Sequence, residues 1–284
     1  MIKERIKNKF IKTETKIIKE PVEYPVLYGD LLNKKVAFIT GGNSGIGLEI
    51  AKSFIRNGAS VIIAARNKEK NEKAINILKK IAKKNQIIDS VIIDFEKIDK
   101  SLDIVKKYLE SSKKKIDILV NCAGIGIGES IGNTKIDDYE KVLKVNLESV
   151  YFLSQLLYEY MKKNNIKGNI LNITSSSSNR PANTPYCVAK WGEKGLTLGM
   201  AKKFIQDGIV VNAIAPGPTA TAMLKVDSKE GIDLPNNPSK RYCMPEEIAN
   251  MAVVLVSDLS KMIVGDTIYM TGGAATITYD DVPY

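Results

Sequence analysis

The chain has 284 residues, of which 44% are hydrophobic and 26% are charged, and its formal net charge is +10. This length and composition suit one α/β domain or two small ones, and no apolar run is long enough to cross a membrane. Histidine is absent altogether, which excludes His-based catalytic triads, His-ligated zinc and histidine general bases, so acid–base work falls to Tyr, Lys, Asp, Glu or Cys.

Strand-like and helix-like stretches alternate after an N-terminal arm of about 30 residues. Short apolar runs predict strands, and longer amphipathic runs predict helices. The predicted strands are Val36–Thr40, Val61–Ala65, Ile87–Ile93, Ile116–Val120, Asn169–Ile173, Ile209–Ile214 and Thr267–Met270. The predicted helices are Gly45–Arg56, Lys68–Asn85, Asp99–Ser111, Ile136–Asn164, Pro185–Gln206 and Pro245–Ser257.

This order of elements predicts the fold class. Continuous apolar strands are typical of strands that are buried on both faces, and strands separated by single helices form right-handed parallel crossovers. We therefore expect an α/β fold with a single doubly wound parallel sheet of the Rossmann type and helices on both faces. Residues 31–284 would form this domain, residues 1–30 would form the arm, and ligands would bind at the carboxyl ends of the strands.

A glycine-rich loop, Thr40–Gly47, joins the first predicted strand to the first predicted helix. Glycine allows positive φ angles and a close approach of the backbone to a ligand, and the helix N-terminus offers free N–H groups to a pyrophosphate. A tight turn is the alternative, but the position between an apolar strand and a helix favours a dinucleotide site. The residues expected to bind the cofactor are Gly41, Asn43, Ser44, Gly45, Ile46 and Gly47.

The spacing Thr-Gly-x-x-x-Gly-x-Gly in this loop resembles that of the short-chain dehydrogenase/reductase family, and the resemblance extends roughly from Leu32 to Gly273. It implies an NAD(P)-dependent oxidoreductase, most similar to the 3-oxoacyl reductase branch. It also implies a homo-oligomer, a dimer or tetramer, that forms through the two long helices Ile136–Asn164 and Pro185–Gln206. Residues Tyr24–Tyr28 of the arm are a further candidate for contact with a neighbouring subunit.

The end of the second strand indicates which dinucleotide would bind. An acidic residue there would accept the ribose hydroxyls of NAD, but Ala65 occupies that place and Arg66 follows it. A guanidinium pairs well with a phosphate, so we expect NADP rather than NAD, and a solvent-facing Arg66 is the alternative. The resemblance also implies that the ends of the third and fourth predicted strands line the adenine or hold the adjacent strand. The residues there are Asp94 and Phe95 after the third strand, and Asn121, Ala123 and Gly124 after the fourth. Cys122 stands where the family commonly has Asn, which we interpret as a change in packing.

Tyr186 and Lys190 are the candidate reacting groups. Four residues apart on a helix, they share a face, and a neighbouring ammonium favours the phenolate form of a tyrosine. The pair therefore suits proton transfer near neutral pH; a surface pair is the alternative.

The resemblance assigns roles to this pair and to two further residues. Tyr186 would protonate the carbonyl oxygen as hydride arrives at carbon, and Lys190 would also hold the nicotinamide ribose. Ser175 would hydrogen-bond the substrate oxygen. The loop from Ser175 to Tyr186 is about two residues shorter than is usual for the family, so Ser176 and Ser177 remain alternatives. Asn146 matches the asparagine that bends its helix and positions water for proton relay.

The segment after the sixth predicted strand carries a loop that would contact the nicotinamide amide. Its candidate residues are Pro216, Gly217, Thr219 and Thr221. The polar stretch Met223–Met244 would follow as a mobile substrate lid.

These observations predict hydride transfer between NADP(H) and a small-molecule carbonyl or alcohol. A catalytically weak dinucleotide-binding sensor or structural protein is the alternative, and the Ser, Tyr, Lys and Asn set counts against it. A nucleotide-sugar epimerase or dehydratase is disfavoured because no separate sugar domain is evident. We expect no metal, nucleic-acid or membrane partner.

Charge and cysteine content bear on the location. Residues 1–20 hold seven Lys or Arg against three Glu, and the remaining positive charge is dispersed Lys. Such charge indicates either a solvated surface or attraction to acidic partners. Cys122, Cys187 and Cys243 are odd in number and far apart, which is typical of free thiols in a reducing compartment. With no secretory signal at the start, we expect a cytoplasmic protein.

Overall fold

The computed structural model describes residues 29–112, 115–224, 226 and 231–279. The predicted N-terminal arm lies outside the described residues except for its last two positions, and the segment Tyr24–Tyr28 lies outside them entirely.

The described residues form one seven-stranded sheet in the order β3-β2-β1-β4-β5-β6-β7, and all neighbouring strands are parallel. The predicted doubly wound parallel sheet is confirmed, and each strand lies within two residues of its predicted bounds. The strands are β1 (Val36–Thr40), β2 (Ser60–Ala65), β3 (Ile88–Ile92), β4 (Ile118–Asn121), β5 (Asn169–Ile173), β6 (Val210–Pro216) and β7 (Thr267–Met270).

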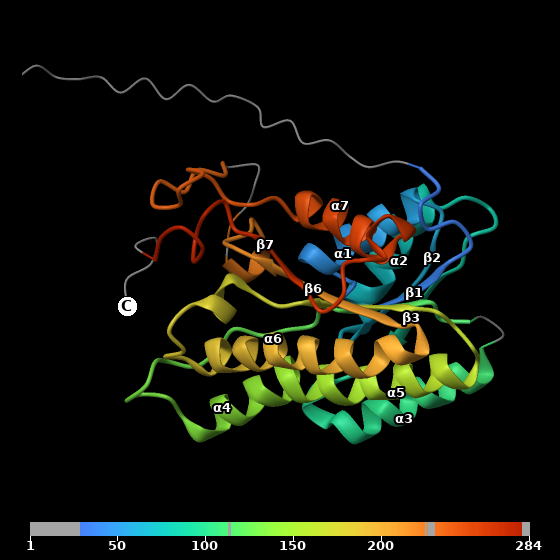
Figure 1. The fold of residues 1–284 in the computed structure, drawn as a ribbon, viewed down its shortest axis with the longest axis horizontal. Coiled ribbons are helices and arrows are strands. Elements are labelled where there is room, and N and C mark those ends of the chain that lie inside the picture. The colour runs from blue at the N-terminus through green and yellow to red at the C-terminus, as the bar shows by residue number, and fades with distance from the viewer. Residues whose placement is uncertain (1–28, 113–114, 225, 227–230, 280–284) are drawn as a thin grey trace, which may run out of the picture.

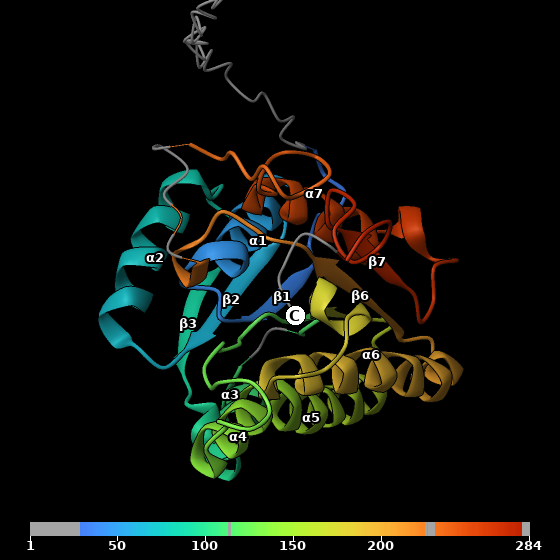
Figure 2. The same ribbon diagram turned by 90° about the vertical axis from the view of Figure 1, so that its left-hand side faces the viewer.

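The helices lie in two layers, one on each face of the sheet. Figures 1 and 2 show α1, α2 and α7 over one face and α3, α4, α5 and α6 over the other. The helices are α1 (Gly45–Arg56), α2 (Lys68–Ile81), α3 (Ile98–Ser111), α4 (Ile136–Leu143), α5 (Ser149–Lys163), α6 (Pro185–Phe204) and α7 (Pro245–Val256). No helix within the described ranges is both long and apolar enough to span a membrane.

Alternate residues of the central strands supply two separate cores. In β1, Ile39 belongs to the core beneath α1 and α7, whereas Phe38 belongs to the core beneath α3, α5 and α6. Both side chains are fully buried, as expected because successive side chains of a strand point to opposite faces. Burial of such a side chain contributes about 1.5–3 kcal/mol, so both helical layers are tied to the same strands.

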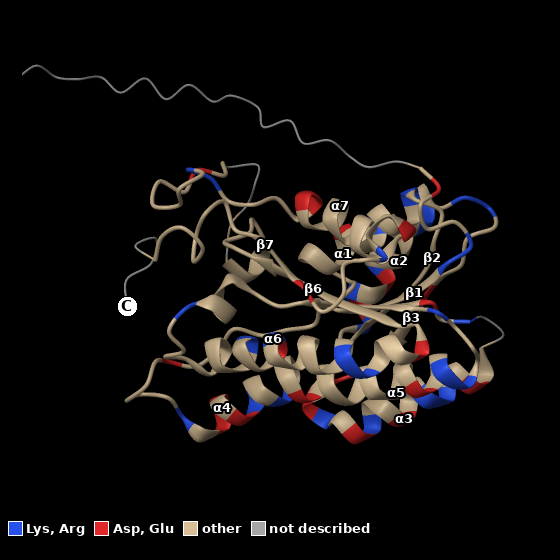
Figure 3. Cartoon of the chain, viewed as in Figure 1, with Lys and Arg blue, Asp and Glu red and all other residues tan. Residues whose placement is uncertain are grey.

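Charged residues lie over the outer helices with both signs intermixed, as Figure 3 shows for α3, α4 and α5. The Lys-rich composition therefore does not form a basic stripe on these helices. This arrangement agrees with the solvated-surface interpretation of the net charge.

The predicted helix Ile136–Asn164 is helical from Ile136 to Lys163, but it is not a regular α-helix throughout. The structure divides it into α4 and α5, with a π-helical turn at Lys144–Glu148 between them. Such single π turns occur frequently at functional sites, and this one contains Asn146.

The predicted helix Lys68–Asn85 is too long at its C-terminal end. It ends at Ile81 because Ala82 adopts an extended conformation. The Gln86 amide then donates hydrogen bonds to the carbonyls of Ile55 (2.8 Å) and Ala59 (2.7 Å). The end of α2 is therefore set by its contact with the segment that follows α1.

Candidate active site

Three adjoining cavities follow the carboxyl edge of the sheet. The first, of about 230 Å³, lies beside the ends of β1, β2 and β3, the second, of about 190 Å³, reaches Lys190, and the third, of about 450 Å³, opens beyond Tyr186. Gly41 lines the first two cavities, and Tyr186 lines the second and third. They therefore form one crevice where the fold predicts a ligand site.

Most of the predicted site residues line this crevice. Asn121 and Asn146 are the exceptions, because both are buried behind it. The predicted residues that line it are Gly41, Asn43, Ser44, Gly45, Ile46, Gly47, Arg66, Asp94, Phe95, Ala123, Gly124, Ser175, Tyr186, Lys190, Pro216, Gly217, Thr219 and Thr221.

The glycine loop is held tightly at the end of β1. The Thr40 hydroxyl accepts hydrogen bonds from the backbone amides of Cys122 (3.0 Å) and Ala123 (3.1 Å). Gly41 has a φ of +67°, and a Cβ there would lie 3.0 Å from the Ala123 backbone. A Cβ at Gly47 would overlap the carbonyl group of Gly41. Glycine is therefore required at both positions for this close approach of loop, helix and strand.

The N-terminus of α1 faces the crevice with its amides uncapped by side chains. Ser44 occupies the N-cap position but makes no capping hydrogen bond, and the first turn carries no acidic residue. The Asn43 amide instead donates to Asn71 (2.8 Å). Free amides and the positive end of the helix dipole suit an anionic group.

Arg66 follows β2 and lines the first cavity. Its guanidinium lies 2.8 Å from one Glu96 oxygen, and Lys141 lies 3.0 Å from the other. The Arg66 side chain remains 60% exposed. It is thus both accessible from solvent and paired, which the sequence did not indicate.

Asp94 and Phe95 line the same cavity at the end of the third strand. The Asp94 carboxylate accepts a hydrogen bond from the Glu96 backbone amide (3.2 Å), and the Asp94 backbone amide donates one to the Ser101 hydroxyl (3.1 Å). Phe95 is buried. Both residues are therefore fixed by their own local structure.

Asn121 and Cys122, at the end of β4, lie in surroundings that indicate a role in packing rather than in catalysis. The Asn121 amide donates to Ser154 and to Asn172, each at 2.9 Å. Burial raises the pKa of the Cys122 thiol to about 12, so the thiol keeps its proton near neutral pH. Both observations agree with the interpretation of Cys122 as a packing residue.

Asn146 holds the segment after β4 through hydrogen bonds of both its side-chain oxygen and its side-chain nitrogen. Its oxygen accepts from the Ile125 amide, and its nitrogen donates to the Ile125 carbonyl, each at 2.8 Å. The side chain is fully buried. The π turn thereby fixes the wall of the crevice that continues from Gly124.

Tyr186 and Lys190 lie on the first turns of α6 and face the crevice together. Thr184 caps this helix by accepting from the Cys187 amide. The Lys190 ammonium lies 5.7 Å from the centre of the Tyr186 ring and donates to the Ile173 carbonyl at 3.1 Å. The predicted pair is thus brought to the end of β5.

Three serines line the same cavity as Tyr186, namely Ser175, Ser176 and Ser177. The Ser175 hydroxyl accepts from the Ser177 amide at 3.1 Å. Ser178 is turned away and donates to the Ser175 carbonyl at 2.7 Å. The alternatives among the first three serines therefore stay open.

The loop after β6 reaches the glycine loop from the opposite side. Thr219 donates to the Gly217 carbonyl at 2.9 Å, and Thr221 donates to the Thr219 carbonyl at 3.3 Å. The Thr221 side chain lies beside Gly45. Within the predicted lid, Met223 and Leu224 line the largest cavity, whereas residues 225 and 227–230 lie outside the described residues.

Glu193 is a site residue that was not predicted from the sequence. This residue is 1% exposed, and both of its carboxylate oxygens accept hydrogen bonds from Lys190. The available signal was its spacing, because Glu193 follows Lys190 by three residues on the same helix. In the described part of the chain, no group of three or more His, Cys, Asp or Glu residues could hold a metal ion.

Comparison with known proteins places this site among reductases and dehydrogenases. Residues 41–275 match the family model described as enoyl-(acyl carrier protein) reductase. The chain is 36% identical over 244 residues to the 3-oxoacyl-[acyl-carrier-protein] reductase FabG of Haemophilus influenzae, with 84% of this chain and 97% of that protein covered. It is 31% identical over 255 residues to glucose 1-dehydrogenase 2 of Bacillus subtilis, with 87% and 96% covered.

Solved structures give the same result. A short chain dehydrogenase from Bacillus anthracis has a TM-score of 0.76 at 30% identity, with 87% of this chain and 98% of that chain covered. A variant of actinorhodin polyketide ketoreductase with NADPH also has a TM-score of 0.76, at 26% identity, with 84% and 96% covered.

Proposed function

The chain belongs to the short-chain dehydrogenase/reductase family, and we propose that it transfers a hydride between NADP(H) and a small-molecule carbonyl or alcohol with Tyr186 as the acid/base. The observation that carries this proposal is the second cavity of the crevice. It brings Tyr186 and Lys190 of α6 against the glycine loop, through Gly41 and Gly47.

The crevice fits a dinucleotide. Side chains at Gly41 and Gly47 would fill the space where the loop, α1 and β4 meet, and the free N-terminus of α1 suits a pyrophosphate. The cofactor, when bound, supplies or accepts the hydride. Lys190 would hold its ribose, and the loop with Thr219 and Thr221 would contact its amide.

Arg66 supports NADP as the dinucleotide. No acidic residue occupies the end of β2, where a carboxylate would repel a 2′-phosphate. The exposed guanidinium of Arg66 can exchange its contact with Glu96 for a charge-assisted hydrogen bond to that phosphate. The related ketoreductase with NADPH supports the same choice.

The proton transfer would take place at the Tyr186 hydroxyl. In reduction, the carbonyl carbon gains the hydride while the carbonyl oxygen gains the Tyr186 proton, and the Lys190 ammonium stabilises the phenolate that remains. Ser175 would donate a hydrogen bond to the same substrate oxygen, since its own oxygen already accepts from Ser177. Asn146 would act from behind by holding the crevice wall. Oxidation reverses these steps.

The remaining features are also part of the proposal. Residues 31–284 form one catalytic domain preceded by the arm 1–30. Exposed apolar side chains on α5 and α6, among them Phe152 and Leu198, support homo-oligomer formation through these helices. Three free cysteines support a cytoplasmic location.

A substrate panel tests the function. Purified protein is mixed with NADPH and with a β-keto thioester, a cyclic ketone or a keto sugar, and the absorbance of the reduced nicotinamide is followed. We expect at least one of these compounds to be reduced. Binding of NADPH without turnover of any of them would instead favour a sensor or structural role.

A further inference from the structure

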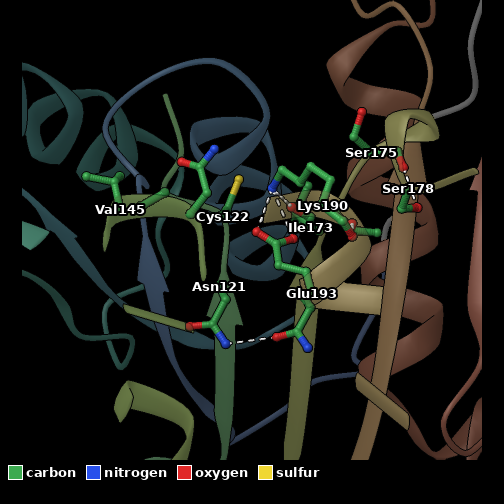
Figure 4. Close-up of polar contacts among 12 residues, drawn as sticks. Asn121, Cys122, Val145, Ile173, Ser175, Ser178, Lys190 and Glu193 are labelled. Carbon is green, nitrogen blue, oxygen red and sulfur yellow. Dashed lines mark hydrogen bonds and ion pairs between the residues drawn. The ribbon is translucent and has the colours of Figure 1, made fainter. Parts of the chain in front are cut away.

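Glu193 forms an ion pair with Lys190 in the interior of the protein. The two side chains are 2% and 4% exposed, whereas the ion pairs Lys52–Glu49, Arg66–Glu96 and Arg241–Glu247 keep both side chains at least 16% exposed. Figure 4 shows the two groups pointing toward one another beside Cys122 and the end of β5.

Glu193 determines where the Lys190 ammonium lies. A lysine ammonium has three N–H donors. Lys190 directs them to the two Glu193 oxygens, at 2.8 and 3.0 Å, and to the Ile173 carbonyl, at 3.1 Å. All three donors thus have partners, two of them on Glu193, and a hydrogen bond from Lys190 to the ribose would replace one of these three.

Glu193 is itself anchored through a buried polar network. Its carbonyl accepts from Thr197 at 2.8 Å, Thr197 accepts from Asn172 at 2.9 Å, and Asn172 accepts from Asn121 at 2.9 Å. The network joins α6 to β5 and β4. The backbone of α6 at Glu193 is therefore tied to the strands that form the crevice floor.

Packing alone does not account for a carboxylate at this place. Burial of a charge costs several kcal/mol before pairing is counted, and an apolar side chain of similar volume is often as stabilising as a buried ion pair. Glu193 lies about two helical turns after Tyr186, and its carboxylate pairs with the ammonium that lies beside the Tyr186 ring.

We propose that Glu193 is a positioning residue for the reaction: its buried carboxylate holds the Lys190 ammonium at the crevice floor and cancels the excess positive charge beside Tyr186. This inference rests on the proposed roles of Tyr186 and Lys190 in proton transfer.

Among the described residues around Lys190, Glu193 is the group that supplies the opposite charge. Lys190 interacts electrostatically with Glu193 and Tyr186 of α6 and with Cys122 at the end of β4. The Cys122 thiol is protonated near neutral pH. Asn146 of the π turn and Thr174 after β5 are uncharged.

Both members of the pair titrate abnormally. Burial by itself would lower the pKa of Lys190, but Glu193 and Tyr186 bring it above its ordinary value. Burial raises the pKa of Glu193 from 4.5 to about 7, although Lys190 opposes this rise. Glu193 therefore gains or loses its charge in the neutral range, beside the proposed proton donor.

Two substitutions separate charge from shape. Glu193→Gln keeps the size and one acceptor oxygen but removes the charge, whereas Glu193→Asp keeps the charge and changes the packing. Glu110→Gln, at an exposed position of α3, is the control for replacing a carboxylate by an amide away from the crevice.

The readout is the pH profile of ketone reduction. Reduction requires protonated Tyr186 and charged Lys190. Without the carboxylate, release of a proton from Lys190 becomes easier, so activity is lost at lower pH. We expect the alkaline midpoint of Glu193→Gln to fall by about 0.5–1 pH unit. Glu193→Asp and Glu110→Gln should keep the midpoint of the unchanged protein.

A profile of Glu193→Gln that superimposes on that of the unchanged protein would overturn the proposal. So would an equal shift in Glu193→Asp, because a purely structural role would respond to shape. Lower stability without a shift would likewise indicate packing alone.

NADPH binding provides a readout that does not depend on turnover. It is followed by the fluorescence of Trp191, the single tryptophan of the chain. At about pH 8, Glu193→Gln should bind the anionic NADPH roughly two- to fivefold more tightly than the unchanged protein. At about pH 5.5 the affinities should converge, because Glu193 then carries a proton. A pH-independent ratio would contradict the inference even if no ketone were reduced, which would refute the proposed function separately.

Discussion

Tyr186 and Lys190 show how much of the proposed chemistry depends on single side chains. One helical turn separates them, and the ammonium lies 5.7 Å from the tyrosine ring. The Tyr186 phenol would supply the proton, and the Lys190 ammonium would stabilise the phenolate that remains. Removal of either group should therefore affect turnover more than binding.

Tyr186→Phe tests this expectation. The substitution keeps the ring and removes the hydroxyl, so turnover should fall by about 10²–10⁴-fold, while the NADPH dissociation constant should change less than about threefold. Initial rates and equilibrium titration measure the two effects. Tyr139→Phe, on the outer side of α4, is the matched control. Retained turnover in Tyr186→Phe would refute the assignment of the proton donor.

Arg66→Gln tests the choice of dinucleotide. A charge-assisted hydrogen bond to a phosphate contributes more than a neutral one, but the Arg66 side chain is 60% exposed and already paired with Glu96. We therefore expect NADPH affinity to fall by only about three- to tenfold, with NADH affinity unchanged. Parallel titrations measure both, and NADH serves as the internal control. Equal losses for the two dinucleotides would contradict recognition of the 2′-phosphate.

At the scale of elements, the π turn between α4 and α5 lets a helix contribute to the crevice wall. It places Asn146 so that both polar atoms of its amide pair with the backbone of Ile125. A regular α-helix through these residues would keep the 3.6-residue repeat, whereas the π turn accommodates one additional residue at this point.

Asn146→Ala should weaken both the fold and the site. The Ile125 amide and carbonyl would lose their partners, which we expect to lower the free energy of unfolding by about 1–3 kcal/mol. Turnover should fall at least tenfold, since the segment after Gly124 forms part of the crevice. Urea denaturation and initial rates provide the measurements, with Asn133→Ala at an exposed position as the control. A variant with lower stability but full activity would limit Asn146 to a structural role.

At the scale of the whole molecule, buried and paired carboxyls make stability depend on pH. The pKa of Glu193 is raised from 4.5 to about 7, chiefly by burial. The pKa of Glu247 is lowered, chiefly by its hydrogen bonds with Arg241. The two groups therefore act in opposite directions and in different pH ranges.

The sign for each group follows from which state holds the proton. Between about pH 4.5 and 7, the unfolded chain releases the Glu193 proton while the folded protein keeps it, so stability falls as pH rises. The contribution of Glu247 is present above its unfolded pKa and is lost as pH falls below it. Urea unfolding at about pH 5 and 7 should thus show a smaller pH-dependent loss in Glu193→Gln than in the unchanged protein. Parallel behaviour of the two proteins would contradict the raised pKa.

The order of the elements, the parallel sheet and most of the crevice follow from the pattern of residues along the chain. Buried parallel strands are recognised in a sequence as short apolar runs. Their carboxyl ends lie at the same edge of the sheet, whatever the details of side-chain packing. Residues as distant in the chain as Gly41, Tyr186 and Thr221 could therefore be assigned to one site.

Features that depend on contacts between residues distant in the chain could be established from the folded protein alone. The apolar pattern runs unbroken through Lys144–Glu148, so it did not reveal the π turn. A Lys and a Glu three residues apart look like a surface pair on any helix, and the burial of Glu193 follows from the packing of α6 against β6 and its hydrogen bonds with β5. The contact between Arg66 and Glu96 exists because the ends of β2 and β3 lie side by side. In each case the local sequence is compatible with both outcomes, and long-range packing selects one.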